Sequence, residues 1–109
     1  MDDFWMNEVR LRGRVSSGPE SRTLPSGDQV VSLRIVVPRS TAVRRRSKAP
    51  VDTFELAAWT SALRRKVNRL KPGDIIEITG ELRRRFSRGT GGARSFVTVD
   101  LQRCDRTSR

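Results

Sequence analysis

The chain has 109 residues, enough for one domain with a single modest core. It carries 23 Lys and Arg against 12 Asp and Glu, so its net charge of +11 makes nucleic acid and acidic membranes the leading kinds of partner. It has no histidine and one cysteine, Cys104, which excludes the common zinc sites, Ser-His and Cys-His catalytic pairs and any internal disulfide. A lone cysteine in so small a domain favours a reducing cytoplasm.

The first elements alternate apolar and polar residues, as half-buried strands do. Residues 7–16 place Val9, Leu11 and Val15 on one side of an extended chain and arginines on the other. A strand of this kind needs a core behind it and water or an anion in front. The acidic residues 1–5 ahead of it are unlike a signal peptide and are expected to form an N-terminal extension.

Turn residues then divide the chain into further strands. Gly18-Pro19 is expected to break the first strand, and residues 19–24 to form a short second arm that ends at the turn 25–28. The next strand, 29–38, is apolar on both faces except at Arg34, which suits a central strand with a mixed outer surface.

Residues 39–50 contain many cations and neither acids nor large apolar residues, which predicts a flexible cationic loop. The strand 51–59 follows, with Phe54 and Trp59 on opposite faces because they are five positions apart. Residues 61–71 predict a helix, since Leu63, Val67 and Leu70 recur at helical spacing.

Two more strands complete the pattern. The strand 75–86 contains Gly80, where a bulge or sharp bend is expected, and a basic hairpin tip at 88–94 leads to the strand 95–103. Residues 104–109 are expected to form a short polar tail. Five strands with one helix between the third and fourth is the layout of an all-β OB-fold, a five-stranded Greek-key barrel, which the domain 6–103 is expected to adopt.

Several segments, in this order and spacing, resemble bacterial single-stranded DNA-binding proteins. They are Asn7–Val15, Pro19-Glu20 with Arg22, Ser26-Gly27 before Val30, Trp59, the helix up to Leu70, Lys71-Pro72-Gly73-Asp74 and Gly80-Glu81-Leu82-Arg83. The resemblance implies an OB-fold that binds single-stranded DNA without strict sequence preference, usually as a homotetramer. It also implies a short or paralogous member, because the acidic C-terminal tail common in the family has no counterpart here.

Several aromatic positions of the family pattern hold other residues. Thr53 and Ser87 stand where the family usually has a ring, Phe86 lies one position early, and tyrosine is absent. Stacking on bases is therefore expected to be weaker than usual, with arginine taking a larger share of binding. Alternation also divides the run of arginines on the fourth strand, since Arg83 and Arg85 share one face and Arg84 lies on the other.

The expected DNA-binding residues combine arginines and lysines, for phosphates, with rings that could instead belong to the core. They are Arg34, Arg39, Arg44, Arg45, Arg46, Lys48, Phe54, Trp59, Arg83, Arg85, Phe86, Arg88 and Arg94.

The sequence thus predicts a cytoplasmic, nucleoid-associated protein that coats single-stranded DNA during replication, repair, recombination or DNA uptake. No catalysis, cofactor, metal, membrane or small-molecule substrate is expected. The alternatives are a protein–protein module of a replication or recombination assembly and a single-stranded RNA-binding domain.

Overall fold

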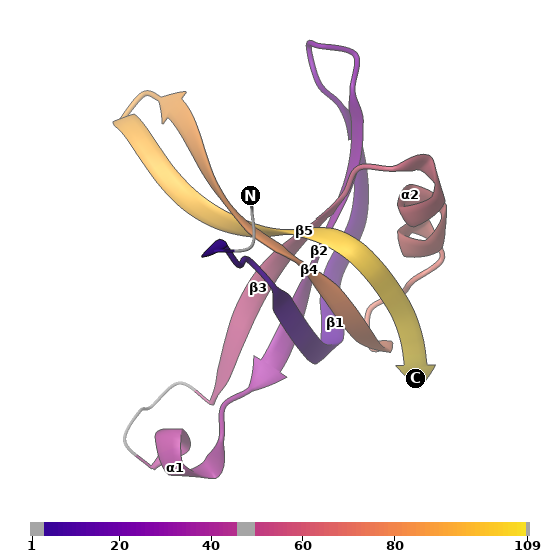
Figure 1. Ribbon diagram of the computed structural model, residues 1–109, viewed down its shortest axis with the longest axis vertical. Coiled ribbons are helices and arrows are strands. Elements are labelled where there is room, and N and C mark those ends of the chain that lie inside the picture. The colour runs from indigo at the N-terminus through magenta and orange to yellow at the C-terminus, as the bar shows by residue number, and fades with distance from the viewer. Residues whose placement is uncertain (1–3, 46–49, 109) are drawn as a thin grey trace.

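The computed structural model describes residues 4–45 and 50–108, which form a five-stranded barrel with a helix on one side (Figure 1). The strands are β1 (Val9–Thr23), β2 (Gln29–Pro38), β3 (Val51–Ala58), β4 (Ile75–Gly89) and β5 (Gly92–Ser108), and the barrel closes in the order β1-β2-β3-β5-β4. Helix α2 (Ser61–Asn68) lies between β3 and β4. The predicted OB-fold is therefore confirmed. Within the loop expected at 39–50, α1 (Thr41–Arg44) forms a single helical turn.

β1 is one continuous strand, and the prediction of a break at Gly18-Pro19 was wrong. Its first half pairs with β4 and its second half with β2, so the strand must bend between them. Two register shifts, between Val15 and Ser17 and between Ser17 and Glu20, provide the bend, and Gly18 adopts a φ of +93° that favours glycine. From Glu20 to Thr23, β1 again pairs with β2. The turn residues alone could not indicate this pairing.

The core consists of the inward-facing residues of all five strands. Among the fully buried side chains are Val15, Ile35, Leu56, Ile76, Ile78 and Val99. Each contributes about 1.5–3 kcal/mol through burial of apolar surface. α2 adds Val67 to this core, and Leu70 just beyond the helix covers it as well. The helix begins where the Thr60 hydroxyl accepts the Leu63 N–H at 3.2 Å and ends at Asn68, three residues before the predicted end at 71.

β4 and β5 extend beyond the barrel as a two-stranded arm, visible in orange and yellow in Figure 1. At its other end β5 continues to Ser108, so residues 104–108, expected as a polar tail, belong to the barrel. Cys104 is 3% exposed and packs in the core. Burial raises the pKa of its thiol to about 11, which keeps the sulfur protonated and unreactive at neutral pH.

The predicted irregularity at Gly80 is confirmed by a register shift between β4 and β5 at Thr79 and Gly80. A Cβ at Gly80 would lie 2.3 Å from the Asp100 carbonyl oxygen and 2.8 Å from a Val99 methyl carbon. The two strands therefore approach as closely as they do only because this residue has no side chain.

Gly80→Ala is expected to lower the free energy of unfolding by about 1–3 kcal/mol, because the added methyl group must displace backbone. Urea denaturation of the two proteins measures the difference. Gly91→Ala is the matched control, since a Cβ there meets nothing within 4 Å. Equal stability of the two variants would show that β4 and β5 can separate at this point without cost.

Candidate nucleic-acid interface

Strands β2, β3, β5 and β4 present a continuous outward surface, which we call the outer sheet face. Its register is fixed by pairs of neighbours: Arg34 lies opposite Glu55, Ala57 beside Asp100, and Arg83 opposite Thr98. We define the face by the polar and aromatic side chains that these pairs align, namely Arg34, Glu55, Trp59, Glu81, Arg83, Arg85, Phe96, Thr98 and Asp100.

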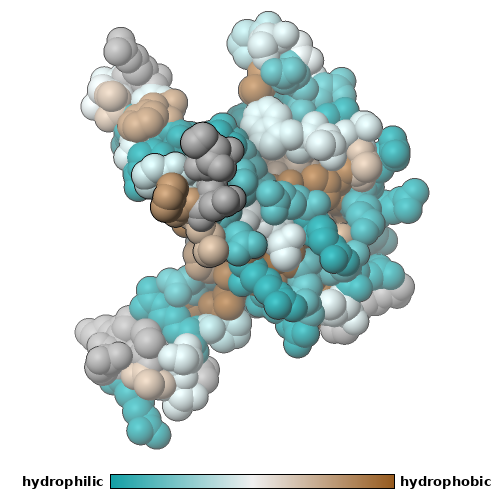
Figure 2. Space-filling view, in the orientation of Figure 1, coloured by the Kyte–Doolittle hydropathy of each residue, from teal (hydrophilic) through white to brown (hydrophobic). Residues whose placement is uncertain are grey.

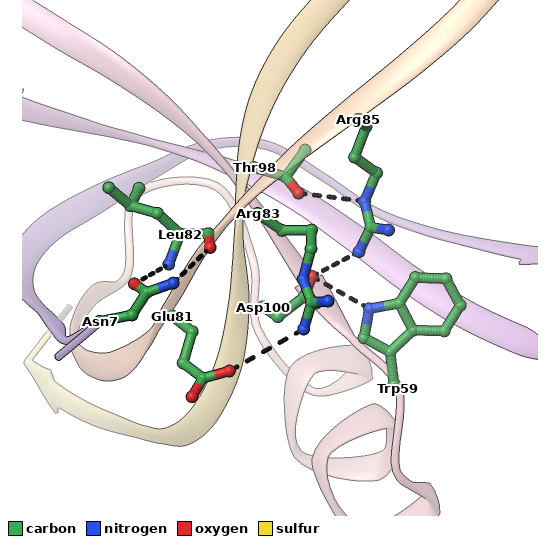
Figure 3. A network of polar contacts seen from close by, with 8 residues as sticks. All are labelled: Asn7, Trp59, Glu81, Leu82, Arg83, Arg85, Thr98 and Asp100. Atoms are coloured by element: carbon green, nitrogen blue, oxygen red, sulfur yellow. Dashed lines mark hydrogen bonds and ion pairs between the residues drawn. The ribbon is translucent and has the colours of Figure 1, made fainter. Parts of the chain in front are cut away.

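Asp100 lies at the centre of a polar network on this face (Figure 3). Its Oδ1 accepts the indole N–H of Trp59 at 3.1 Å and a guanidinium N–H of Arg85 at 2.7 Å. Its Oδ2 is 3.3 Å from the Nε of Arg83. The network joins the end of β3 to both strands of the arm.

The surroundings of Asp100 explain how a carboxylate can be sheltered there. Its side chain is only 16% exposed, because the partner side chains cover it. A carboxylate removed from water needs strong donors in exchange, and two guanidinium groups with one indole N–H supply them. One negative charge thus offsets part of the positive charge of two arginines predicted to meet DNA.

The other predicted cations of this region lie in different settings. Arg34 is exposed and 3.4 Å from the Glu55 carboxylate. Arg39, beyond the end of β2, bonds Asp52 at 2.8 Å, and its guanidinium lowers the pKa of that carboxyl. Arg45 and Arg94 are exposed, on the β2–β3 connection and the arm.

The remaining predicted cations are Arg44, Arg46, Lys48 and Arg88. Arg46 and Lys48 lie outside the described residues. Arg44 ends α1 and Arg88 lies on β4 near the tip of the arm.

The predicted aromatic residues separate into two groups. Trp59 is half-buried on the outer sheet face, whereas Phe54 lies opposite Ile35 and packs against the core. Phe86 is 74% exposed, but it is adjacent to Arg85 on one strand and so points to the other side of the arm. Only Trp59 of the three thus contributes a ring to the face that carries Arg83 and Arg85.

Sequence reasoning missed Phe96, Thr98 and Asp100. Phe96 is 42% exposed and lies opposite Arg85, and Thr98 accepts a hydrogen bond from the Arg85 Nε at 3.2 Å. The alternation of β5 does place these three side chains on one face. The sequence does not show in which register β5 pairs with β4, because the glycine-rich tip between them does not determine it.

The other side of the arm carries exposed apolar side chains together with Arg84, which lies opposite Val97 and donates a hydrogen bond to the Ser95 hydroxyl at 3.3 Å. Leu82, Phe86 and Val97 are exposed there, by 48%, 74% and 44%. The side chain of Asn7 bonds both the N–H and the C=O of Leu82 at 2.8 Å, which ties the start of the chain to the base of this surface. Figure 2 shows a mostly hydrophilic molecule in which hydrophobic residues also emerge on the arm. We call Leu82, Phe86 and Val97 the apolar arm surface.

Within residues 4–45 and 50–108, no cluster of three or more acidic or cysteine side chains is placed to hold a metal ion. No helix in the same part of the chain is long and apolar enough to cross a membrane.

Comparison with known proteins identifies the family. Residues 6–106 match the single-strand binding protein family. The chain belongs to this family. It is 30% identical over 96 residues to a single-stranded DNA-binding protein of Bacillus cereus, covering 88% of this chain and 56% of that protein. It is also 30% identical over 106 residues to one of Deinococcus radiodurans, covering 95% of this chain and 35% of that protein.

The matched region therefore spans about half or less of the length of these relatives. Among solved structures, the fold is similar to that of the Plasmodium falciparum SSB complex with ssDNA, with a TM-score of 0.77, 18% identity and 96% coverage of both chains. That likeness supports the OB-fold architecture.

Ion pairs around the barrel predict loss of stability in acid. Arg39 lowers the pKa of Asp52, Arg12 that of Glu77, and Lys66 that of Asp105. A carboxyl whose pKa is lower in the folded state stabilises the fold above its unfolded pKa of about 4, and this stabilisation is lost as the pH falls through the folded pKa.

The midpoint of urea unfolding should therefore fall as the pH is lowered from about 5 to 2. The triple variant Asp52→Asn, Glu77→Gln, Asp105→Asn should show a shallower pH dependence over the same range. An identical dependence in both proteins would mean that other carboxyl groups govern the acid response.

Proposed function

We propose that this chain binds single-stranded DNA along the outer sheet face, without strict sequence preference and without catalysis. The observation that carries the proposal is the grouping of Trp59, Arg83 and Arg85 around Asp100 on a face that also holds Arg34 and Phe96. Membership of the single-strand binding protein family supports it. The protein would protect exposed strands in the cytoplasm during replication, repair, recombination or DNA uptake.

The chemistry of this face suits an unpaired strand. Guanidinium groups bind phosphates of any sequence, and flat side chains stack on any base. The proposed contacts are Arg34, Arg39, Arg45, Arg83, Arg85, Arg94 and Phe96, with Trp59 behind Arg85. The predicted Arg44, Arg46 and Lys48, between β2 and β3 in the sequence, and Arg88, on β4, would add to them. A net charge of +11 would draw the polyanion in from a distance.

Binding of a labelled oligothymidine tests the proposal. If about five phosphates are neutralised, a plot of log affinity against log salt should have a slope near −3.5. The double variant Arg34→Ala, Arg83→Ala should flatten that slope by about 1.4, the share of two phosphates. Arg12→Ala with Arg106→Ala, on β1 and the end of β5, removes the same charge outside the proposed face and should flatten the slope less.

Other results would favour a different function. No binding at low salt would contradict the proposal and leave a protein–protein module. Tighter binding of an RNA of equal sequence would point to an RNA-binding domain.

We further propose that the protein assembles as a homotetramer through the apolar arm surface. Leu82, Phe86 and Val97 expose apolar area on the side of the arm that faces away from Arg85, so an assembly contact there would leave the DNA face open. Phe86 is therefore assigned to assembly rather than to DNA.

Light scattering after size exclusion should give about 50 kDa, four times the 12.4 kDa chain mass. Phe86→Ser with Val97→Ser should lower that mass by removing apolar contact, while Ser87→Ala, next along the same strand, should not. A monomer at every concentration would rule out the assembly.

A further inference from the structure

The Arg85 guanidinium covers the Trp59 ring. Its central carbon lies 5.2 Å from the ring centroid, within the range of a cation–π contact. Its Nε donates to the Thr98 hydroxyl at 3.2 Å and its Nη2 to Asp100 at 2.7 Å. An arginine on a DNA-binding face is ordinarily a flexible cation, but this one is fixed by a ring, a hydroxyl and a carboxylate (Figure 3).

Trp59 is equally restrained. Its indole N–H donates to Asp100 at 3.1 Å, and its backbone carbonyl accepts a guanidinium N–H of Arg64. The ring is half-buried, and Arg85 lies over it. A nucleobase that approaches Trp59 from the side of Arg85 therefore meets a guanidinium group before it meets the ring.

We propose that Arg85, backed by Trp59, is the platform on which a nucleobase stacks, with Thr98 and Asp100 as positioning residues. The inference rests on the proposed binding of single-stranded DNA. Guanidinium planes stack on unpaired bases as aromatic rings do. A guanidinium that is already fixed also loses little side-chain freedom when a base settles on it.

The arrangement favours base contact over phosphate contact for this residue. Two of its donor nitrogens are engaged by Thr98 and Asp100, and the Asp100 carboxylate offsets its charge. Arg83 shares the same carboxylate but is 53% exposed, compared with 32% for Arg85. Arg83 is thus the more available of the two for a phosphate.

Arg85→Lys separates the two roles, because lysine keeps the charge and loses the plane. Stacking on a base is worth about 1–3 kcal/mol, so affinity for oligothymidine should fall about tenfold while the salt slope stays unchanged. Arg12→Lys is the matched control, a guanidinium that is paired with Glu77 on another part of the barrel and lies over no aromatic ring of the described residues. Wild-type affinity in Arg85→Lys would overturn the proposal and make Arg85 a phosphate contact.

Tryptophan emission gives a second readout. Trp5→Phe leaves Trp59 as the one tryptophan of the two in the chain. In that parent, saturating oligothymidine should quench emission weakly, because a guanidinium separates base and ring. Adding Arg85→Ala should lower affinity yet increase quenching at saturation, since the base now reaches the indole.

The failures of the two proposals are distinguishable. Strong quenching in the Trp5→Phe parent, equal to that in the Arg85→Ala variant, would mean that the base displaces Arg85 and would overturn this inference alone. Absence of binding by the parent at low salt would overturn the proposed function and this inference with it. Thermal unfolding of each variant shows whether it is folded, and Arg85→Lys keeps the test decisive should Arg85→Ala be unstable.

Discussion

The close approach of β4 and β5 at Gly80 and Asp100 is the constraint on which the rest of the structure depends. Only a residue without a side chain leaves room for the Asp100 backbone there. On one side of this point the two strands complete the barrel, and on the other they leave it as the arm. The Asp100 side chain, held at the same point, then fixes Trp59 and two arginines of the arm. Barrel closure and the candidate binding face therefore share one structural origin.

The outer sheet face is cationic, yet its arginines come with acidic neighbours. Arg34 and Glu55 form an exposed ion pair, whereas the pair of Arg39 and Asp52 is part-buried. Exposed ion pairs contribute little to stability, so exchanging the Glu55 carboxylate for a phosphate costs the fold little. Asp100 differs because it is sheltered and bonded by several donors, so its partners are held in place. The face thus combines cations that can exchange partners with a central group that cannot.

Much of the fold could be predicted from the sequence, because alternation, turn residues and helical spacing are local signals. They placed the strands, the helix after β3 and the irregularity at Gly80. The continuity of β1 and the extension of β5 to Ser108 could not be predicted, since both depend on pairing with strands distant in sequence. The site shows the same limit: Trp59 and Asp100 are 41 positions apart, and only the parallel register of β3 and β5 brings them together. The local sequence around Asp100 therefore gives no sign of the contacts that this residue makes.

Stacking a base on an arginine instead of on an aromatic ring changes how the contact responds to salt. An aromatic ring contributes stacking that is insensitive to salt, whereas an unpaired guanidinium adds a charge whose contribution is screened as salt rises. Pairing that guanidinium with a sheltered carboxylate reduces its net charge and leaves its flat surface in place. In the proposed complex, Asp100 would make the base contact of Arg85 behave more like that of a ring, while Arg34 and Arg83 would supply the salt-dependent attraction. A chain with Thr53 and Ser87 at positions where its family usually has rings could in this way retain base stacking on a strongly basic face.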